Sequence, residues 1–184
     1  MVSLSDLRRF KAEGRKFSCL TCYDASMAKA MEIAEVDSIL IGDSLGMSIQ
    51  GRDSTLPVTV ADMAYHTAAV RRGNQHAFIM TDLPFMSYAT LNDALQSSKT
   101  VMQAGAQMVK MEGGAWLAET VQVLTRNGIP VCVHLGLTPQ SVHVFGGYKL
   151  QARTRAAADQ LIADCKAVVE AGAALLLLEC VPAQ

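Results

Sequence analysis

Short apolar runs that each end on a charged or imidazole side chain recur along this chain, and they limit its possible folds. The runs lead into Asp43, Asp82, Glu112, His134 and Glu179. Continuous apolar runs of this length are typical of parallel strands that are buried on both faces. Enzymes built as α/β barrels keep their reactive side chains at the carboxyl ends of such strands. We therefore expect these side chains to gather at one end of a sheet.

Segments with helical character separate the apolar runs, so strands and helices alternate. Thr59 is a good N-cap for one helix, and Gly73 is expected to stop it. A short repeat supports the register, because Glu112 and Glu179 each lie seven residues after a glycine. We expect helices near residues 5–13, 25–35, 60–72, 91–104, 115–127 and 156–171, strands near 17–23, 38–42, 77–82, 108–112, 131–134 and 174–179, and long loops over 44–59 and 135–153.

Strict alternation of strand and helix predicts an α/β fold with a parallel sheet and right-handed crossovers. A doubly wound sheet is the rival, but it usually has a glycine-rich turn after the first strand, where this chain has Tyr23-Asp24-Ala25-Ser26. The pattern therefore favours a (β/α)₈ TIM barrel. Only about six βα units are present, whereas a closed barrel takes about 250 residues. We expect one domain over residues 1–184 that is incomplete before strands seven and eight, or that a partner completes.

The composition excludes several classes of partner. The 184 residues have a formal net charge of −1 without a basic stripe, which argues against nucleic acid. No apolar run approaches the roughly 20 residues of a membrane span. The N-terminus lacks the apolar stretch of a secretory signal, so we expect a cytoplasmic protein. Cys19 and Cys22 have the spacing of a redox motif, but they fall within an expected strand and are interpreted as reduced thiols.

Two acids are candidates for a metal site. Asp43 and Asp82 end neighbouring expected strands at equivalent positions. Mg²⁺ prefers oxygen ligands and usually keeps several waters, so two carboxylates and a bidentate substrate would suit it. Either acid taken alone is more simply explained as a cap of the following loop or helix. Their joint placement favours a site.

The remaining strand-end residues allow two interpretations each. Lys110 and Glu112 lie on one face of a strand, where they either form a structural salt bridge or bind an anionic substrate and support a metal. His134 is either a structural residue or part of the site. Glu179 follows four leucines, and a carboxyl group beside an apolar wall suits a general base. Its alternative is a solvent-exposed acid at the end of the chain.

Longer motifs around these residues closely resemble ketopantoate hydroxymethyltransferases. The resemblance covers the whole chain, and ordered motifs of this length are collectively specific. The matching stretches include IGDSLGM at 41–47 and HLGLTPQ at 134–140. The other matching stretches are residues 50–59, 65–73, 82–85, 109–114 and 178–182.

The resemblance implies an activity in pantothenate biosynthesis. A hydroxymethyl group would pass from 5,10-methylenetetrahydrofolate to 3-methyl-2-oxobutanoate through an enolate stabilised by Mg²⁺, giving ketopantoate. It also implies a (β/α)₈ barrel in a large homo-oligomer. By the same resemblance, the metal site would consist of Asp43 and Asp82 as ligands with Glu112 close to the metal shell. The substrate would contact Asp43, Ser44, Asp82, Lys110 and His134, and Glu179 would accept the proton.

Two other functions stay open on the sequence. A related Mg²⁺-dependent α-keto acid lyase or mutase would use strand-end acids on the same barrel, and it would not need methylenetetrahydrofolate. The second is a catalytically incomplete fragment of the transferase, because the family continues with further βα units beyond the sixth strand.

Overall fold

One parallel sheet of six strands, in the order β1-β2-β3-β4-β5-β6, forms the centre of the computed structural model, which describes residues 1–183. Sequential order confirms the α/β prediction and excludes the doubly wound rival, whose strand order reverses at a switch point. The strands form a partial barrel. They are β1 (Cys19–Thr21), β2 (Ser38–Ile41), β3 (Phe78–Asp82), β4 (Met108–Glu112), β5 (Val131–Gly136) and β6 (Leu175–Glu179).

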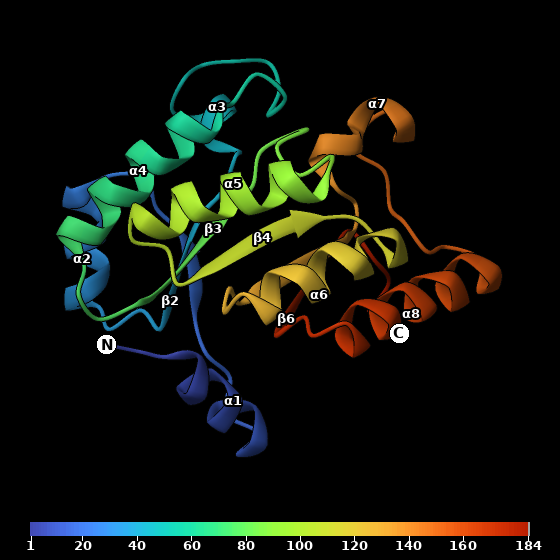
Figure 1. The fold of residues 1–184 in the computed structure, drawn as a ribbon, viewed down its shortest axis with the longest axis horizontal. Helices are drawn as coiled ribbons and strands as arrows, with labels where there is room; N and C mark the ends of the chain where they lie inside the picture. The colour runs from blue at the N-terminus through green and yellow to red at the C-terminus, as the bar shows by residue number, and fades with distance from the viewer. Residues whose placement is uncertain (184) are drawn as a thin grey trace.

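Helices cover the outer face of this sheet and follow one another around it (Figure 1). Helix α2 packs on α4, α4 on α5, α5 on α6, and α6 on α8. Among the described residues, no helix is long and apolar enough to cross a membrane. The helices are α1 (Leu4–Ala12), α2 (Ala25–Ile33), α3 (Leu45–Ser48), α4 (Val60–Gly73), α5 (Leu91–Gln103), η1 (Ala115–Leu117), α6 (Ala118–Arg126), η2 (Pro139–Ser141), α7 (Val142–Phe145) and α8 (Arg155–Glu170).

Most expected helices begin and end close to their predicted residues. Thr59 caps α4 as predicted, and its side chain accepts a hydrogen bond from the backbone of Asp62. The predicted role of Gly73 as a stop beyond the helix is wrong, because Gly73 is the last residue of α4 and Asn74 is the cap. A Cβ at Gly73 would lie 2.2 Å from the carbonyl oxygen of Ala25. Glycine is therefore needed there for the close approach of α2 and α4.

The expected long loops contain short helices that the sequence analysis did not predict. Helix α3 lies in the segment after β2, and η2 and α7 lie in the segment after β5. Figure 1 shows α3 and α7 at the end of the sheet opposite α1. Elements of three or four residues are too short to show a helical period. The expected helix over 115–127 is divided into η1 and α6.

Two hydrophobic cores lie on opposite faces of the sheet. Ile79, Val109 and Val133 pack toward the outer helices, whereas the alternate residues Met80 and Met108 face the inside of the partial barrel. Helix α1 closes the inner core at the amino ends of the strands. The inner core includes Val2, Leu7, Phe10, Phe78 and Cys132. Polar side chains replace this apolar lining toward the carboxyl ends of the same strands.

We predict that Leu7→Ala destabilises the protein through the inner core. Leu7 is 2% exposed, and removing a buried leucine side chain costs about 2–5 kcal/mol. Arg8→Ala is the matched control, because Arg8 is exposed on the same helix. Urea unfolding should show the loss of stability for Leu7→Ala only. Equal midpoints for the two variants would mean that α1 contributes little to the core.

Candidate active site

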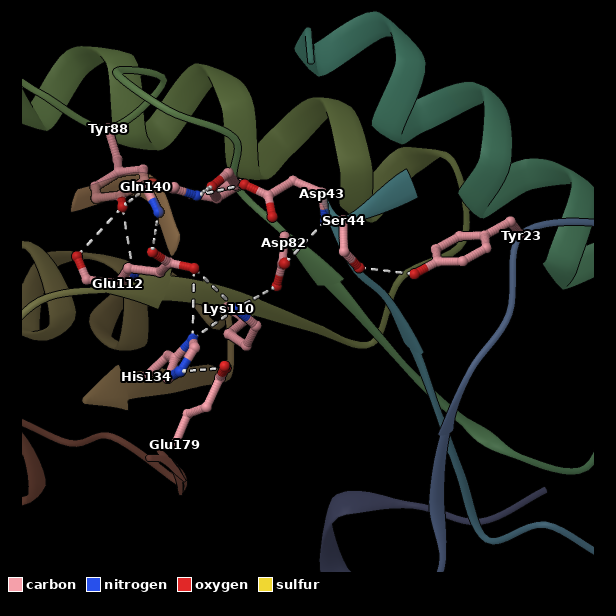
Figure 2. A network of polar contacts seen from close by, with 11 residues as sticks. Tyr23, Asp43, Ser44, Asp82, Tyr88, Lys110, Glu112, His134, Gln140 and Glu179 are labelled. Atoms are coloured by element: carbon pink, nitrogen blue, oxygen red, sulfur yellow. Dashed lines mark hydrogen bonds and ion pairs between the residues drawn. The ribbon is translucent and has the colours of Figure 1, made fainter. Parts of the chain in front are cut away.

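Lys110 lies at the centre of a buried polar cluster at the carboxyl ends of β3, β4 and β5 (Figure 2). Its Nζ is 2.8 Å from Asp82 Oδ1, 3.7 Å from Glu112 Oε1 and 3.3 Å from His134 Nδ1. The strand register explains these contacts, because Asp82 is opposite Lys110 and Glu112 is opposite His134. Burial alone would lower the pKa of Lys110, but the carboxylates of Asp82 and Glu112 raise it. Lys110 is therefore a fixed positive charge.

The salt-bridge alternative for Lys110 and Glu112 is only part of this arrangement. The closest carboxylate oxygen to the ammonium belongs to Asp82 rather than Glu112. All three side chains are at most 4% exposed. Lys110 thus lies between an acid of β3 and an acid of β4. A salt bridge within one strand would have involved β4 alone.

Asp43 and Asp82 lie side by side, as their positions in the sequence predict. The backbone N–H of Asp43 donates to Asp82 Oδ2 at 3.0 Å. Burial and the neighbouring carboxylate of Asp82 raise the pKa of Asp43 to about 8. Burial also raises the pKa of Asp82, although Lys110 opposes that effect. The single ammonium of Lys110 is therefore too little positive charge to balance both of these buried acids.

His134 connects Glu112 to Glu179. Its Nδ1 is 3.4 Å from Glu112 Oε1, and its Nε2 is 3.3 Å from Glu179 Oε2. Nδ1 thus faces both the ammonium of Lys110 and the carboxylate of Glu112, whereas Nε2 lies within ion-pair distance of Glu179 but makes no hydrogen bond of good geometry. Burial alone would raise the pKa of Glu112, but His134, Lys110 and the backbone N–H of Gln140 together lower it.

Glu179 joins the cluster at its open side. Its side chain is 41% exposed, and its Oε2 lies 3.3 Å from Nε2 of His134. The apolar wall is therefore absent, and the exposure agrees with the alternative interpretation of Glu179 as a solvent-exposed acid. Alternate leucines of β6 point to opposite faces of the sheet, so Leu176 and Leu178 lie on the face away from Glu179.

Ser44 lies beside a small space over Gly42. The hydroxyl of Ser44 hydrogen-bonds that of Tyr23 at 2.8 Å. A Cβ at Gly42 would come within 3.0 Å of Ser44 Oγ and within 3.6 Å of Asp82 Oδ2 and Tyr23 Oη. A side chain at position 42 would therefore fill a cradle lined by three polar groups. The sequence analysis missed Tyr23, which is the second residue after β1 and carries no charge.

Gln140 and Tyr88 are two further members of the cluster that the sequence analysis missed. Gln140 belongs to η2, and its side chain contacts Asp43 and Tyr88. Tyr88 lies in the segment between β3 and α5, and its hydroxyl accepts a hydrogen bond from the backbone N–H of Glu112. Neither residue ends an apolar run, so the strand-end pattern could not find them. Gln140 closes the motif HLGLTPQ, and that was its only signal in the sequence.

The donor set fits a hard divalent cation, although it is not a preassembled metal cage. Across residues 1–183, no group of three His, Cys, Asp or Glu side chains has a metal-binding arrangement. Three buried carboxylates, those of Asp43, Asp82 and Glu112, face the single ammonium of Lys110. Asp82 Oδ1 has ion-pair contact but no hydrogen bond of good geometry. Mg²⁺ needs few protein ligands, since it keeps several waters.

We predict that Lys110→Met lowers the free energy of unfolding by about 3–5 kcal/mol near pH 8, because it leaves buried carboxylates without a counter-charge. The pKa of Asp82 is already above its ordinary value, and loss of Lys110 raises it further. When the pKa of a carboxyl group is raised in the folded state, the folded protein becomes more stable as the pH falls and the group takes up a proton. The difference in free energy of unfolding between wild type and Lys110→Met therefore narrows toward about pH 5.

Urea unfolding of wild type and Lys110→Met at both pH values measures this change. Lys99→Met is the control, because Lys99 is exposed on α5, and its stability should match that of wild type. A deficit of equal size at both pH values would mean that lost packing, rather than uncompensated charge, causes the destabilisation.

The chain matches known proteins along its whole length. A family model described as ketopantoate hydroxymethyltransferase matches residues 1–184. Proteins named 3-methyl-2-oxobutanoate hydroxymethyltransferase from Acinetobacter baumannii (strain AYE) and Acinetobacter baylyi are 91% and 86% identical to it over 184 residues. One from Psychrobacter sp. (strain PRwf-1) is 64% identical over 183 residues. Each alignment covers 100% of this chain and 68% of the relative.

More distant solved structures share the fold. A 2,3-dimethylmalate lyase of the PEP mutase/isocitrate lyase superfamily matches with a TM-score of 0.69 and 18% identity, over 97% of this chain and 64% of that chain. A phosphonopyruvate hydrolase in complex with oxalate and Mg²⁺ matches with a TM-score of 0.74 and 14% identity, over 97% of this chain and 63% of that chain. At such identities the likeness shows the fold alone.

Proposed function

Because this chain belongs to the ketopantoate hydroxymethyltransferase family, we propose that its polar cluster adds a one-carbon unit to 3-methyl-2-oxobutanoate and so forms ketopantoate. The observation that carries this proposal is the convergence of a fixed cation, paired acids and a half-exposed glutamate at one end of the sheet. Activation of a keto acid at the carbon beside its ketone needs such a set: positive charge near the oxygens and a base near the carbon.

Lys110 and Ser44 are the proposed contacts of the keto acid. Lys110 remains charged because of its carboxylate neighbours, so it can attract the substrate anion and the negative charge that develops on the keto oxygen. The hydroxyl of Ser44 lies close over Gly42, beside Asp82 Oδ2, where a side chain at position 42 would crowd it. The Tyr23 hydroxyl fixes the Ser44 side chain at 2.8 Å. These groups would orient the carboxylate and ketone before proton transfer.

Glu179 is the proposed base. It would take the proton from the substrate carbon beside the ketone, and the electron pair left there would attack the one-carbon unit of the donor. The C–N bonds that hold this unit in the donor would break, and water would supply the oxygen of the new hydroxyl group. Glu179 is the only acid of the cluster that is substantially exposed, so it can meet a substrate entering from solvent. His134, whose Nε2 lies 3.3 Å from Glu179 Oε2, would help to position it.

Asp43 and Asp82 are the proposed ligands of Mg²⁺, and Glu112 lies near them. When bound, the ion would act as a Lewis acid toward the oxygens of the keto acid. Its charge would also offset the excess of buried carboxylate over ammonium. Glu112 already accepts the Gln140 N–H and contacts His134 and Lys110, so we assign it to the support of the site.

Further parts of the proposal come from the family resemblance. The donor is 5,10-methylenetetrahydrofolate, the sheet belongs to a (β/α)₈ barrel, and the protein is a cytoplasmic homo-oligomer. A lyase or mutase is the second candidate, since distant structural neighbours include such enzymes. Relatives at 91% identity named as hydroxymethyltransferases favour the transferase. Product formation that depends on methylenetetrahydrofolate distinguishes the two activities.

We predict that the chain exchanges the C3 proton of 3-methyl-2-oxobutanoate in D₂O with Mg²⁺ present, and that Glu179→Gln slows the exchange by at least about 100-fold, since a lost general base costs about 10²–10⁴ in rate. Proton NMR of the substrate measures this step without a folate. Glu170→Gln is the control, because Glu170 is exposed at the end of α8.

The control should exchange the proton at the wild-type rate. If wild type exchanges the proton and Glu179→Gln does so equally fast, the base is another group. If the folded wild-type chain does not exchange it at all, these residues do not form a working site in this chain.

We predict that EDTA abolishes the exchange, that added Mg²⁺ restores it, and that Asp82→Asn weakens Mg²⁺ binding. The loss in affinity should exceed the roughly 10–100-fold that removal of an outer partner costs, because a ligand itself is removed. Isothermal titration calorimetry of the folded variants measures the affinity. Asp159→Asn is the control, since Asp159 is exposed on α8 and pairs only with Arg155 among the described residues. Unchanged affinity in Asp82→Asn would exclude Asp82 as a ligand.

A further inference from the structure

Gln140 connects two carboxylates that come from distant parts of the chain. Its Nε2 donates to Asp43 Oδ2 at 2.8 Å, and its backbone N–H donates to Glu112 Oε2 at 2.9 Å. Asp43 lies 97 residues before it in sequence and Glu112 lies 28 residues before it. The residue is 7% exposed. Figure 2 shows it between the two acids, on the side opposite Lys110.

The orientation of the Gln140 amide is fixed by its partners. Nε2 donates both to Asp43 and to the carbonyl oxygen of Leu83, at 3.0 Å from the latter, while Oε1 accepts from the Tyr88 hydroxyl. A flipped amide would place Oε1 against two acceptors and its NH₂ group against a hydroxyl. Only the observed orientation uses both amide hydrogens and the carbonyl oxygen.

Tyr88 contacts both the Gln140 amide and the backbone of Glu112. Its hydroxyl accepts the backbone N–H of Glu112 at 3.3 Å and lies within hydrogen-bonding distance of both the Glu112 carbonyl and Gln140 Oε1. A phenol has a single hydrogen, and the contact with Gln140 is the shorter of the two. The amide of Gln140 is therefore tied to the backbone of β4 at the same point that carries Glu112.

We propose that Gln140 is a positioning residue, held by Tyr88, that orients the Asp43 carboxylate for a divalent cation and keeps Asp43 and Glu112 at a fixed separation. This inference rests on the proposed function, in which Asp43 is a metal ligand. A neutral amide suits this task. It holds one oxygen of Asp43 by a hydrogen bond but adds no positive charge, so it leaves the charge deficit that attracts a cation.

Gln140→Met tests the proposal, because methionine has nearly the length of glutamine and leaves the backbone N–H to Glu112 intact. We expect the Mg²⁺ dissociation constant of the folded variant to rise by about 10–100-fold, as it does when outer partners of metal ligands are removed. Calorimetric titration with Mg²⁺ alone measures it. Gln160→Met is the matched control, since Gln160 donates to Asp164 at 3.1 Å on the surface, and it should bind Mg²⁺ as wild type does.

Tyr88→Phe provides a second variant that removes one oxygen atom. We expect a smaller loss of Mg²⁺ affinity than in Gln140→Met. The double variant should bind no more weakly than Gln140→Met alone, because Tyr88 acts through the amide. A merely structural role would instead lower the melting temperature, with the affinity of the folded protein unchanged in both single variants.

The outcomes separate this inference from the function on which it rests. If wild type binds Mg²⁺ and both variants bind it within twofold of wild type, the positioning role is overturned and the proposed function stands. If Tyr88→Phe and Gln140→Met weaken binding additively, Tyr88 does not act through Gln140. If folded wild type neither binds Mg²⁺ nor exchanges the substrate proton, the proposed function fails, and the positioning role fails with it.

Discussion

The buried contact between Lys110 and Asp82 is the interaction on which the rest of the site depends. It joins two neighbouring strands in register and places a permanent positive charge inside the partial barrel. Taking these groups out of water costs several kcal/mol per ion, so the pair does not by itself favour folding. The surrounding strands must supply that free energy. A site of this kind is expected where chemistry, rather than stability, maintains the charges.

The same strand faces provide both the supporting core and the site. Met108 and Lys110 are two residues apart on β4, so they point to the same side of the sheet, one toward α1 and one toward the polar cluster. Helix α1 seals the amino ends of the strands with Leu7 and Phe10. The apolar half of the partial barrel thus offsets the cost of burying acids in the other half. Because the core lies at the amino ends of the strands and the polar cluster at their carboxyl ends, one short strand can contribute to both.

The strand-end acids could be predicted because hydrophobic period and strand polarity are local properties of a sequence. Asp43, Asp82, Lys110, Glu112, His134 and Glu179 all follow from that pattern, and all lie in the cluster. Gln140, Tyr88 and Tyr23 could not be found in this way. They are uncharged, they lie outside the strands, and their contacts join segments far apart in sequence. For Glu179 the sequence left an apolar wall and solvent exposure both open, and the structure shows the exposed alternative, beside His134.

Chemistry in this fold is decided by side chains rather than by the sheet that carries them. Lyases, mutases and hydrolases share the architecture at 13–19% identity, whereas relatives at 86–91% identity carry the hydroxymethyltransferase name. In this chain three buried acids surround one ammonium, and a neutral amide lies between two of the acids. Under the proposed function, arginine or lysine in place of Gln140 would offset the negative charge of the acids and weaken the attraction for a cation. The buried acids that cost folding stability would then be the groups that attract a dication.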